Sequence, residues 1–130
     1  MILVDSSVWI DYFNGKRTPQ SEWLHSALGN EFIVMGDLIL AEVLQGFKKD
    51  SDFNKVKEMF LNFPFMEMLG LELAVKGAEN YRFLRKKGVT VRKTIDILIG
   101  TFCIHHKISL LHDDQDFIPL IEYMNLSSIM

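Results

Sequence analysis

Short apolar runs alternate with amphipathic stretches along the whole chain. Four apolar runs have the length and composition of buried strands, and they cover residues 2–4, 32–35, 65–69 and 108–111. Apolar residues at helical spacing predict helices over 8–13, 21–28, 38–49, 51–63, 72–87 and 95–106, followed by a last short helix and a candidate strand at 126–129. Strands that are apolar on both faces and alternate with helices predict an α/β fold, with a mostly parallel central sheet flanked by helices.

Local signals support several of the predicted helix ends. Ser6, Ser7 and Thr94 are placed to cap the first and last long helices, because a hydroxyl oxygen can accept a first-turn N–H. Asn14 and the glycine after it close the first helix, and Pro64 stops the fourth. We therefore expect compact helices with short connections between them.

Length and composition indicate one domain over residues 1–130. The chain is 48% hydrophobic, which suits a single core. Since no apolar run approaches the roughly 20 residues of a membrane span, and MILVD lacks the features of a secretory signal, we expect a cytoplasmic protein without a membrane partner. The single Cys103 excludes an internal disulfide, and the net charge of −3 argues against binding nucleic acid through an overall positive field.

Four acidic residues stand at positions where they can meet. Asp5 ends the first apolar run, and Asp114 lies just past the fourth, so both are expected at the carboxyl edge of a parallel sheet. Glu42 and Asp96 stand among apolar residues near the start of two helices, where a charged side chain is unexpected unless it has a function. Crowded carboxylates repel one another and need a cation. All-oxygen ligation favours Mg²⁺, or Mn²⁺, over zinc.

Four segments in order along the chain are similar to PIN domains, and most closely to VapC-type toxins of toxin–antitoxin pairs. They are MILVDSSVWIDYF, LAEVLQG, VRKTIDILIG and LLHDDQDF, and together they span nearly the entire length. The resemblance implies a PIN-like, Rossmann-like three-layer sandwich. It also implies that Asp5, Glu42, Asp96 and Asp114 are catalytic metal-binding acids, and that Asp116 assists as a further metal ligand.

The resemblance further implies a function and partners. VapC-type toxins are metal-dependent endoribonucleases that leave 5′-phosphate and 3′-hydroxyl ends, and they are commonly homodimers. A cognate VapB-type antitoxin holds them inactive, with a segment that crosses a hydrophobic groove and reaches the acidic pocket. Apolar side chains in the predicted helices over 38–63 are candidate interface material, and ordinary core packing is the alternative.

Each singled-out residue also has a purely structural interpretation. Asp5, Asp114 and Asp116 could each cap a helix or form an Asx turn. Asp37 is favoured as a helix cap, and His112 is a weak catalytic candidate. The basic pairs at 16–17 and 92–93 could guide RNA or simply be solvated surface.

Other functions fit the sequence less well. A phosphoaspartyl enzyme of the haloacid dehalogenase type needs a second Asp at the position of Ser7, and a receiver module needs a lysine after a late strand, where acids follow Leu111 instead. A non-catalytic protein-binding module with a PIN fold is the main alternative, and the four acids argue against it. The sequence does not identify the RNA that is cut, the number of metal ions or the antitoxin.

Overall fold

The computed structural model describes all residues 1–130 as four strands, seven α-helices and one 3₁₀ helix. The strands are β1 (Ile2–Val4), β2 (Ile33–Gly36), β3 (Phe65–Met66) and β4 (Ser109–Leu111). The helices are α1 (Ser6–Phe13), α2 (Pro19–Ala27), α3 (Asp37–Leu44), α4 (Asp50–Phe60), α5 (Leu71–Lys86), α6 (Thr94–His106), the 3₁₀ helix η1 (Gln115–Phe117) and α7 (Ile118–Met124).

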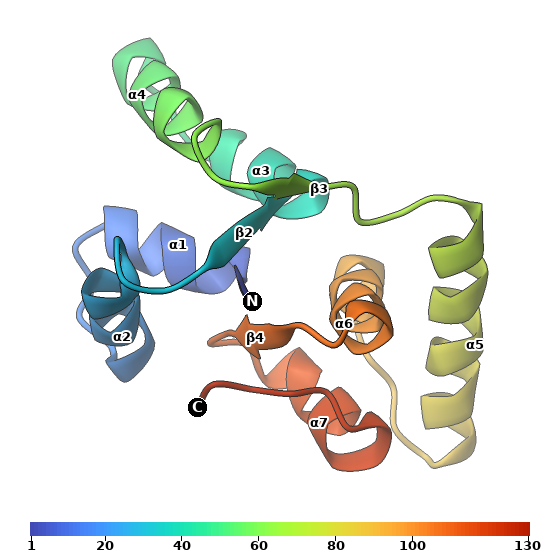
Figure 1. Cartoon of the computed structure of the whole chain (residues 1–130). Helices are drawn as coiled ribbons and strands as arrows, with labels where there is room; N and C mark the ends of the chain where they lie inside the picture. The colour runs from blue at the N-terminus through green and yellow to red at the C-terminus, as the bar shows by residue number, and fades with distance from the viewer.

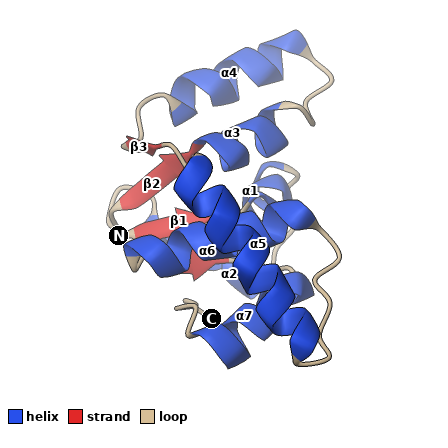
Figure 2. Ribbon diagram, turned by 90° about the vertical axis from the view of Figure 1, so that its right-hand side faces the viewer, coloured by secondary structure: helices blue, strands red, loops and turns tan.

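The strands form one sheet in the order β3-β2-β1-β4, and every pairing between them is parallel. Ile2 lies opposite Ile33 on one side and opposite Ser109 on the other. Figure 1 shows α1 and α2 on one side of the sheet and α5 and α6 on the other, and Figure 2 shows the same arrangement from the side. The predicted α/β fold is therefore confirmed, with a sheet that is parallel throughout rather than mostly so.

Helices cover β1, β2 and β4 on both faces, whereas the edge strand β3 is exposed or half-buried. Every residue of β1 and β2 is buried, and so are the last two residues of β4. Trp9 on α1 is fully buried and contacts Phe60 of α4, with ring centroids 4.9 Å apart. Removing a side chain of this size from water contributes on the order of 2–3 kcal/mol. The same helix that begins beside Asp5 is therefore fixed firmly to the core.

Several predicted element ends are wrong by a few residues. Asp5, not Ser6 or Ser7, caps α1, and Lys93 occupies the N-cap position of α6 while Thr94 is its first helical residue. The predicted helix over 38–49 ends at Leu44, the strand over 65–69 contains only two residues, and the candidate strand at 126–129 is reduced to a single bridge at Ser128. Short polar side chains and tertiary pairing, which periodicity does not report, decided these ends.

The strand order reverses at β1, in the middle of the sheet. The chain adds β2 and β3 on one side of β1 and later adds β4 on the other side. Such a reversal is the place where open parallel sheets bind ligands. The helix α6 leads into β4 and packs against the sheet, so its N-terminus lies at the same edge. No helix is both long enough and apolar enough to cross a membrane.

Candidate metal centre

Asp5 stands at the carboxyl end of β1 with its side chain fixed by the first turn of α1. Its backbone N–H continues the pairing of β1 with β4 by donating to the carbonyl of Leu111 at 2.9 Å. Its Oδ2 accepts hydrogen bonds from the backbone N–H of Ser7 at 3.0 Å and from the Ser7 hydroxyl at 2.6 Å. Its Oδ1 is buried and has no hydrogen-bond partner. A buried carboxylate oxygen without a donor favours a cation as its partner.

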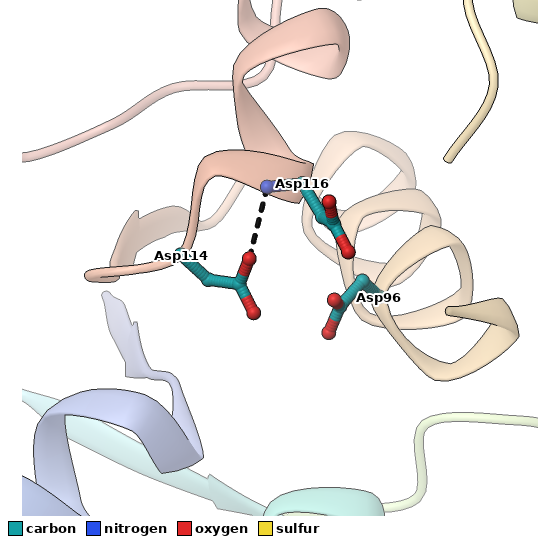
Figure 3. Close-up of side chains that lie close together, drawn as sticks. All are labelled: Asp96, Asp114 and Asp116. Atoms are coloured by element: carbon teal, nitrogen blue, oxygen red, sulfur yellow. Dashed lines mark hydrogen bonds between the residues drawn. The ribbon is translucent and has the colours of Figure 1, made fainter. Parts of the chain in front are cut away.

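Asp96, Asp114 and Asp116 bring carboxylate oxygens together within 4.8 Å of one another. Figure 3 shows Asp96 reaching from α6 toward the two aspartates of the loop after β4. Asp114 caps η1, with its Oδ1 accepting the backbone N–H of Asp116 at 2.9 Å. The Oδ2 of Asp116 is buried without a hydrogen-bond partner. These three side chains come from two separate parts of the chain, and the fold makes them neighbours.

Glu42 borders this cluster from the second turn of α3. It is half-buried, and its Oε1 accepts the hydroxyl of Ser6 at 3.1 Å. Ser6 follows Asp5 directly, so this hydrogen bond couples α3 to the start of α1. Asp5 and Glu42 thus lie beside the three clustered aspartates without belonging to the tightest group of oxygens.

Burial and mutual repulsion shift the proton affinities of these acids. Burial raises the pKa of Asp96 to about 7, and the charge of Asp114 acts in the same direction. Burial also raises the pKa of Asp5, with Asp114 adding to the rise, and raises the pKa of Glu42, with Asp5 adding to the rise. The negative charges of Asp5 and Asp114 thus raise the pKa of neighbouring acids, as expected for carboxylates that lie close together.

Asp114 differs because a lysine contacts it directly. Burial alone would raise the pKa of Asp114, but hydrogen bonds from Lys93 and from the backbone N–H of Asp116 outweigh that effect, so its pKa lies below the ordinary value. Lys93 Nζ lies 2.6 Å from Asp114 Oδ2 and 3.2 Å from Asp96 Oδ2. Arg92 Nε lies 3.6 Å from Asp116 Oδ1. Two cations therefore line one wall of the acidic site.

The remaining singled-out residues have mainly structural contacts. Asp37 Oδ1 accepts the backbone N–H groups of Leu38 and Met68, both at 2.9 Å, and thereby ties α3 to the segment after β3. His112 is buried, burial lowers its pKa, and its Nδ1 accepts the backbone N–H of Asp114 at 3.3 Å. This contact supports the loop that carries Asp114. Lys16 and Arg17 line a separate hollow of about 520 Å³ between α1 and α2.

The donor set suits a hard divalent ion. Asp5, Glu42, Asp96, Asp114 and Asp116 offer only carboxylate oxygens, the ligands preferred by Mg²⁺ and Mn²⁺. Cys103 is not a candidate ligand, because its side chain is buried in the core and burial raises the pKa of its thiol. Three buried carboxylate oxygens, on Asp5, Asp96 and Asp116, accept no hydrogen bond and are further sites for ion contact. The residues present thus fit a divalent metal.

The fold and the site together define a class of protein. It is an α/β protein whose parallel sheet carries a carboxylate cluster at the point where the strand order reverses. The family model of the PIN domain matches residues 2–120. The chain belongs to the PIN domain family, as the sequence resemblance indicated.

Named relatives and solved structures agree with this family. The chain is 28% identical over 130 residues to the VapC ribonuclease Mb1587 of Mycobacterium bovis, covering 98% of this chain and 97% of the relative. The ribonuclease VapC11 of Mycobacterium tuberculosis gives the same identity and coverage. Among solved structures, VapBC2 from Rickettsia felis, bound to a DNA fragment from its promoter, has a TM-score of 0.75 at 19% identity, covering 98% of this chain and 97% of that one.

A second solved structure shares the fold to a similar degree. FitAcB from Neisseria gonorrhoeae has a TM-score of 0.76 at 15% identity, covering 100% of this chain and 97% of that one. At such identities the likeness is evidence of fold alone. The predicted resemblance to VapC-type proteins is confirmed by the sequence identity to the two VapC ribonucleases, which extends over nearly the full length.

Sequence reasoning missed the part that Ser7 and Lys93 take in this site. Ser7 Oγ donates to Asp5 and accepts the backbone N–H of Asp113 at 3.1 Å, so it joins the loop after β1 to the loop after β4. Lys93 was considered only as a guide for RNA, although it precedes Asp96 by three positions, the spacing at which side chains of one helical turn meet. That spacing could have indicated the contact between Lys93 and Asp96. No local pattern indicated the contacts of Ser7.

Proposed function

We propose that this protein is a Mg²⁺-dependent endoribonuclease, the toxin component of a toxin–antitoxin pair, that hydrolyses RNA phosphodiester bonds. The carrying observation is the group of carboxylate oxygens from Asp96, Asp114 and Asp116 within 4.8 Å, with the partnerless Oδ1 of Asp5 buried beside it. Membership of the PIN domain family and similarity to proteins named VapC ribonucleases support the same assignment.

The chain's own residues would prepare this site for catalysis. Asp5, Glu42, Asp96 and Asp114 would hold the metal, with Asp116 as an additional ligand. A bound Mg²⁺, or Mn²⁺, supplies charge neutralisation at the phosphate and a water of lowered pKa. Ser7 hydrogen-bonds one oxygen of Asp5, and the other, Oδ1, has no hydrogen-bond partner and could contact a bound ion. Ser6 holds Glu42 in register with Asp5. These contacts fix the ligand oxygens before substrate arrives, which is how a preorganised site lowers a barrier.

RNA would approach the acidic centre through local positive charge, because the net charge of −3 offers no general attraction. Arg92 and Lys93 lie beside the acids, and both are largely exposed. Lys16 and Arg17 lie on the connection between α1 and α2, where they line a separate hollow with His25. We assign these two clusters to phosphate contact and propose a cytoplasmic location, where RNA is available.

The proposal also includes partners. The structural neighbours described above are named VapBC2 and FitAcB, and on this likeness we propose a VapB-type antitoxin as the cognate inhibitor. From the resemblance to VapC-type toxins we also propose a homodimer. Among the aromatic and methionine side chains of residues 47–63, Phe60 is buried, and Phe47, Met59 and Phe63 pack partly against the core. Leu61 at the end of α4 and Phe65 on β3 remain exposed and offer apolar area to a partner.

The decisive experiment compares two neighbouring acids on one loop. Purified wild-type protein, Asp114→Asn and Asp113→Asn are incubated with cellular RNA in Mg²⁺ and in EDTA, and the new RNA ends are sequenced. Asp113 is exposed and stands outside the carboxylate cluster, so its variant controls for loss of charge in this loop. We expect cleavage by wild type and Asp113→Asn only in Mg²⁺, with a loss of at least about 100-fold for Asp114→Asn.

An Asp5→Asn variant tests the buried oxygen independently. Its circular dichroism and thermal unfolding should match those of the wild type, or improve, while RNA cleavage is lost. Full cleavage by both Asp5→Asn and Asp114→Asn would refute the assignment. Absence of Mg²⁺ and Mn²⁺ binding in the wild type would favour the alternative, a non-catalytic PIN-fold protein-binding module. Co-expression with the product of the neighbouring gene tests the antitoxin, and light scattering of the purified chain tests the dimer.

A further inference from the structure

Lys93 occupies an unusual place in this site. It is the N-cap residue of α6, one turn before Asp96. Its ammonium group does not extend into solvent but lies between two carboxylates, 2.6 Å from Asp114 Oδ2 and 3.2 Å from Asp96 Oδ2. These oxygens belong to two of the three aspartates that form the closest carboxylate group. A single positive charge thus joins the α6 side of the site to the loop after β4.

The neighbouring cation has a much looser contact. Arg92 has an exposed fraction of 81% and approaches only Asp116, at 3.6 Å. The Lys93 side chain has an exposed fraction of 53%, so about half of its surface is covered. The two residues carry the same charge and are adjacent in sequence, but only Lys93 bridges two acids. Arg92 is therefore a suitable control for the loss of a positive charge at Lys93.

A divalent ion and the Lys93 ammonium have overlapping requirements. Mg²⁺ needs carboxylate oxygens at about 2.0–2.1 Å in near-octahedral geometry. An ammonium group that already donates to Asp114 and pairs with Asp96 competes for the same negative charge, and two cations in this space repel each other. The half-exposed stem of Lys93 lets the ammonium swing into solvent without opening the core.

We propose that Lys93 is a positioning residue of the metal centre: its ammonium group holds Asp96 and Asp114 together and is displaced when a divalent cation binds to them. This inference rests on the proposed metal-dependent function and adds a mechanism for how the acidic site is kept assembled. The displaced ammonium remains at the rim of the site. Lys93 then lowers the apparent affinity for metal, because each binding event must break its two contacts.

The first experiment measures metal affinity in matched variants. Mn²⁺ and Mg²⁺ are titrated calorimetrically into EDTA-stripped wild type, Lys93→Gln and Arg92→Gln, each of which removes one positive charge beside the acids. We expect Lys93→Gln to bind at least about tenfold more tightly than the wild type, within the range typical of coupled sites. Arg92→Gln should differ from the wild type by less than about threefold. Equal tightening in both variants would indicate a general charge effect and would overturn the proposal.

The second experiment observes the displacement itself in the unmodified sequence. Wild-type protein is treated briefly with an amine-acylating reagent in EDTA or in saturating Mg²⁺, and modification at each lysine is measured by mass spectrometry. We expect Mg²⁺ to increase acylation of Lys93 severalfold. Lys76, which pairs with Glu72 at 3.4 Å away from the carboxylate cluster, is the internal control and should not change.

The possible failures are distinguishable. If the wild type binds neither Mg²⁺ nor Mn²⁺, both the proposed function and this inference are overturned. If the wild type binds metal and cleaves RNA but Lys93 acylation stays constant, only the inference is overturned. Thermal unfolding in EDTA gives a further readout: Lys93→Gln should be less stable than Arg92→Gln, since it alone loses the bridge between Asp96 and Asp114.

Discussion

Replacing Asp96 with asparagine should stabilise the protein in the absence of metal. Asp96 is buried and lies with Asp114 and Asp116 in the closest carboxylate group. Its pKa is about 7 in the folded protein, against an ordinary value of 3.8. A proton held in the folded state stabilises it fully below pH 3.8, and that stabilisation is lost as the pH rises through 7. Above pH 7 the ionised carboxylate therefore destabilises the fold, and a neutral amide of the same shape does not.

The size of the effect follows from the same shift. A tenfold change in proton affinity corresponds to about 1.4 kcal/mol, which gives an upper value of about 4 kcal/mol at pH 8. Lys93 pairs with Asp96 and is half exposed to solvent, which screens the interaction, so we expect about 2–4 kcal/mol. For a domain of this length that corresponds to a rise in Tm of about 6–15 °C.

The assay is thermal unfolding in EDTA at several pH values, with Glu58→Gln as a control. Glu58 is exposed on α4 and stands outside the carboxylate cluster. The advantage of Asp96→Asn over the wild type should be small near pH 4, grow up to pH 7 and then level off. In saturating Mg²⁺ the wild type should gain the larger stabilisation, because it binds the ion better. An unchanged or lower Tm for Asp96→Asn at pH 8 in EDTA would refute the reasoning.

Two further substitutions test contacts at the edge of the site. Ser6→Ala removes the hydroxyl that holds Glu42 Oε1 at 3.1 Å, so RNA cleavage should fall by about tenfold with little change in Tm; the control Ser51→Ala, exposed on α4, should keep full activity. Gly36→Ala places a methyl group against the side chain of Met68, so the free energy of unfolding should fall by about 1–3 kcal/mol in urea titrations. If Gly36→Ala has wild-type stability, the packing of β2 against Met68 is looser than the structure indicates.

The apolar pattern determined most of the fold. The runs at Ile2–Val4 and Leu110–Leu111 are buried, and continuous apolar runs of that kind are typical of a parallel sheet covered on both faces. The periodicity of α5 and α6 was equally clear, and their bounds differ from the predicted ranges by one residue. Burial of apolar surface is the largest favourable contribution to folding, so a sequence reports it directly.

The candidate acids could also be named before their geometry was known. Asp5 and Asp114 follow strands, and Asp96 interrupts an apolar helix start, so position alone marked them. Their grouping was a different matter. Only the coordinates brought Asp96, Asp114 and Asp116 within 4.8 Å and set Asp5 and Glu42 at the border of that group. Distances between carboxylates depend on helix orientation and loop path, which are properties of the packed chain.

The sequence by itself determined the buried runs of β1 and β4, which acids follow the strands and to which family the chain belongs, because each is written in local order and spacing. Burial at Phe32, Phe65 and Leu69 was predicted wrongly, since the structure leaves these side chains exposed. The tertiary structure alone decided the contacts among groups remote in sequence. Ser6 meets Glu42 across 36 positions, Ser7 meets the backbone of Asp113, and Lys93 joins Asp96 to Asp114. Such polar contacts are short-ranged and directional, and they form only once apolar packing has fixed the backbone that carries them.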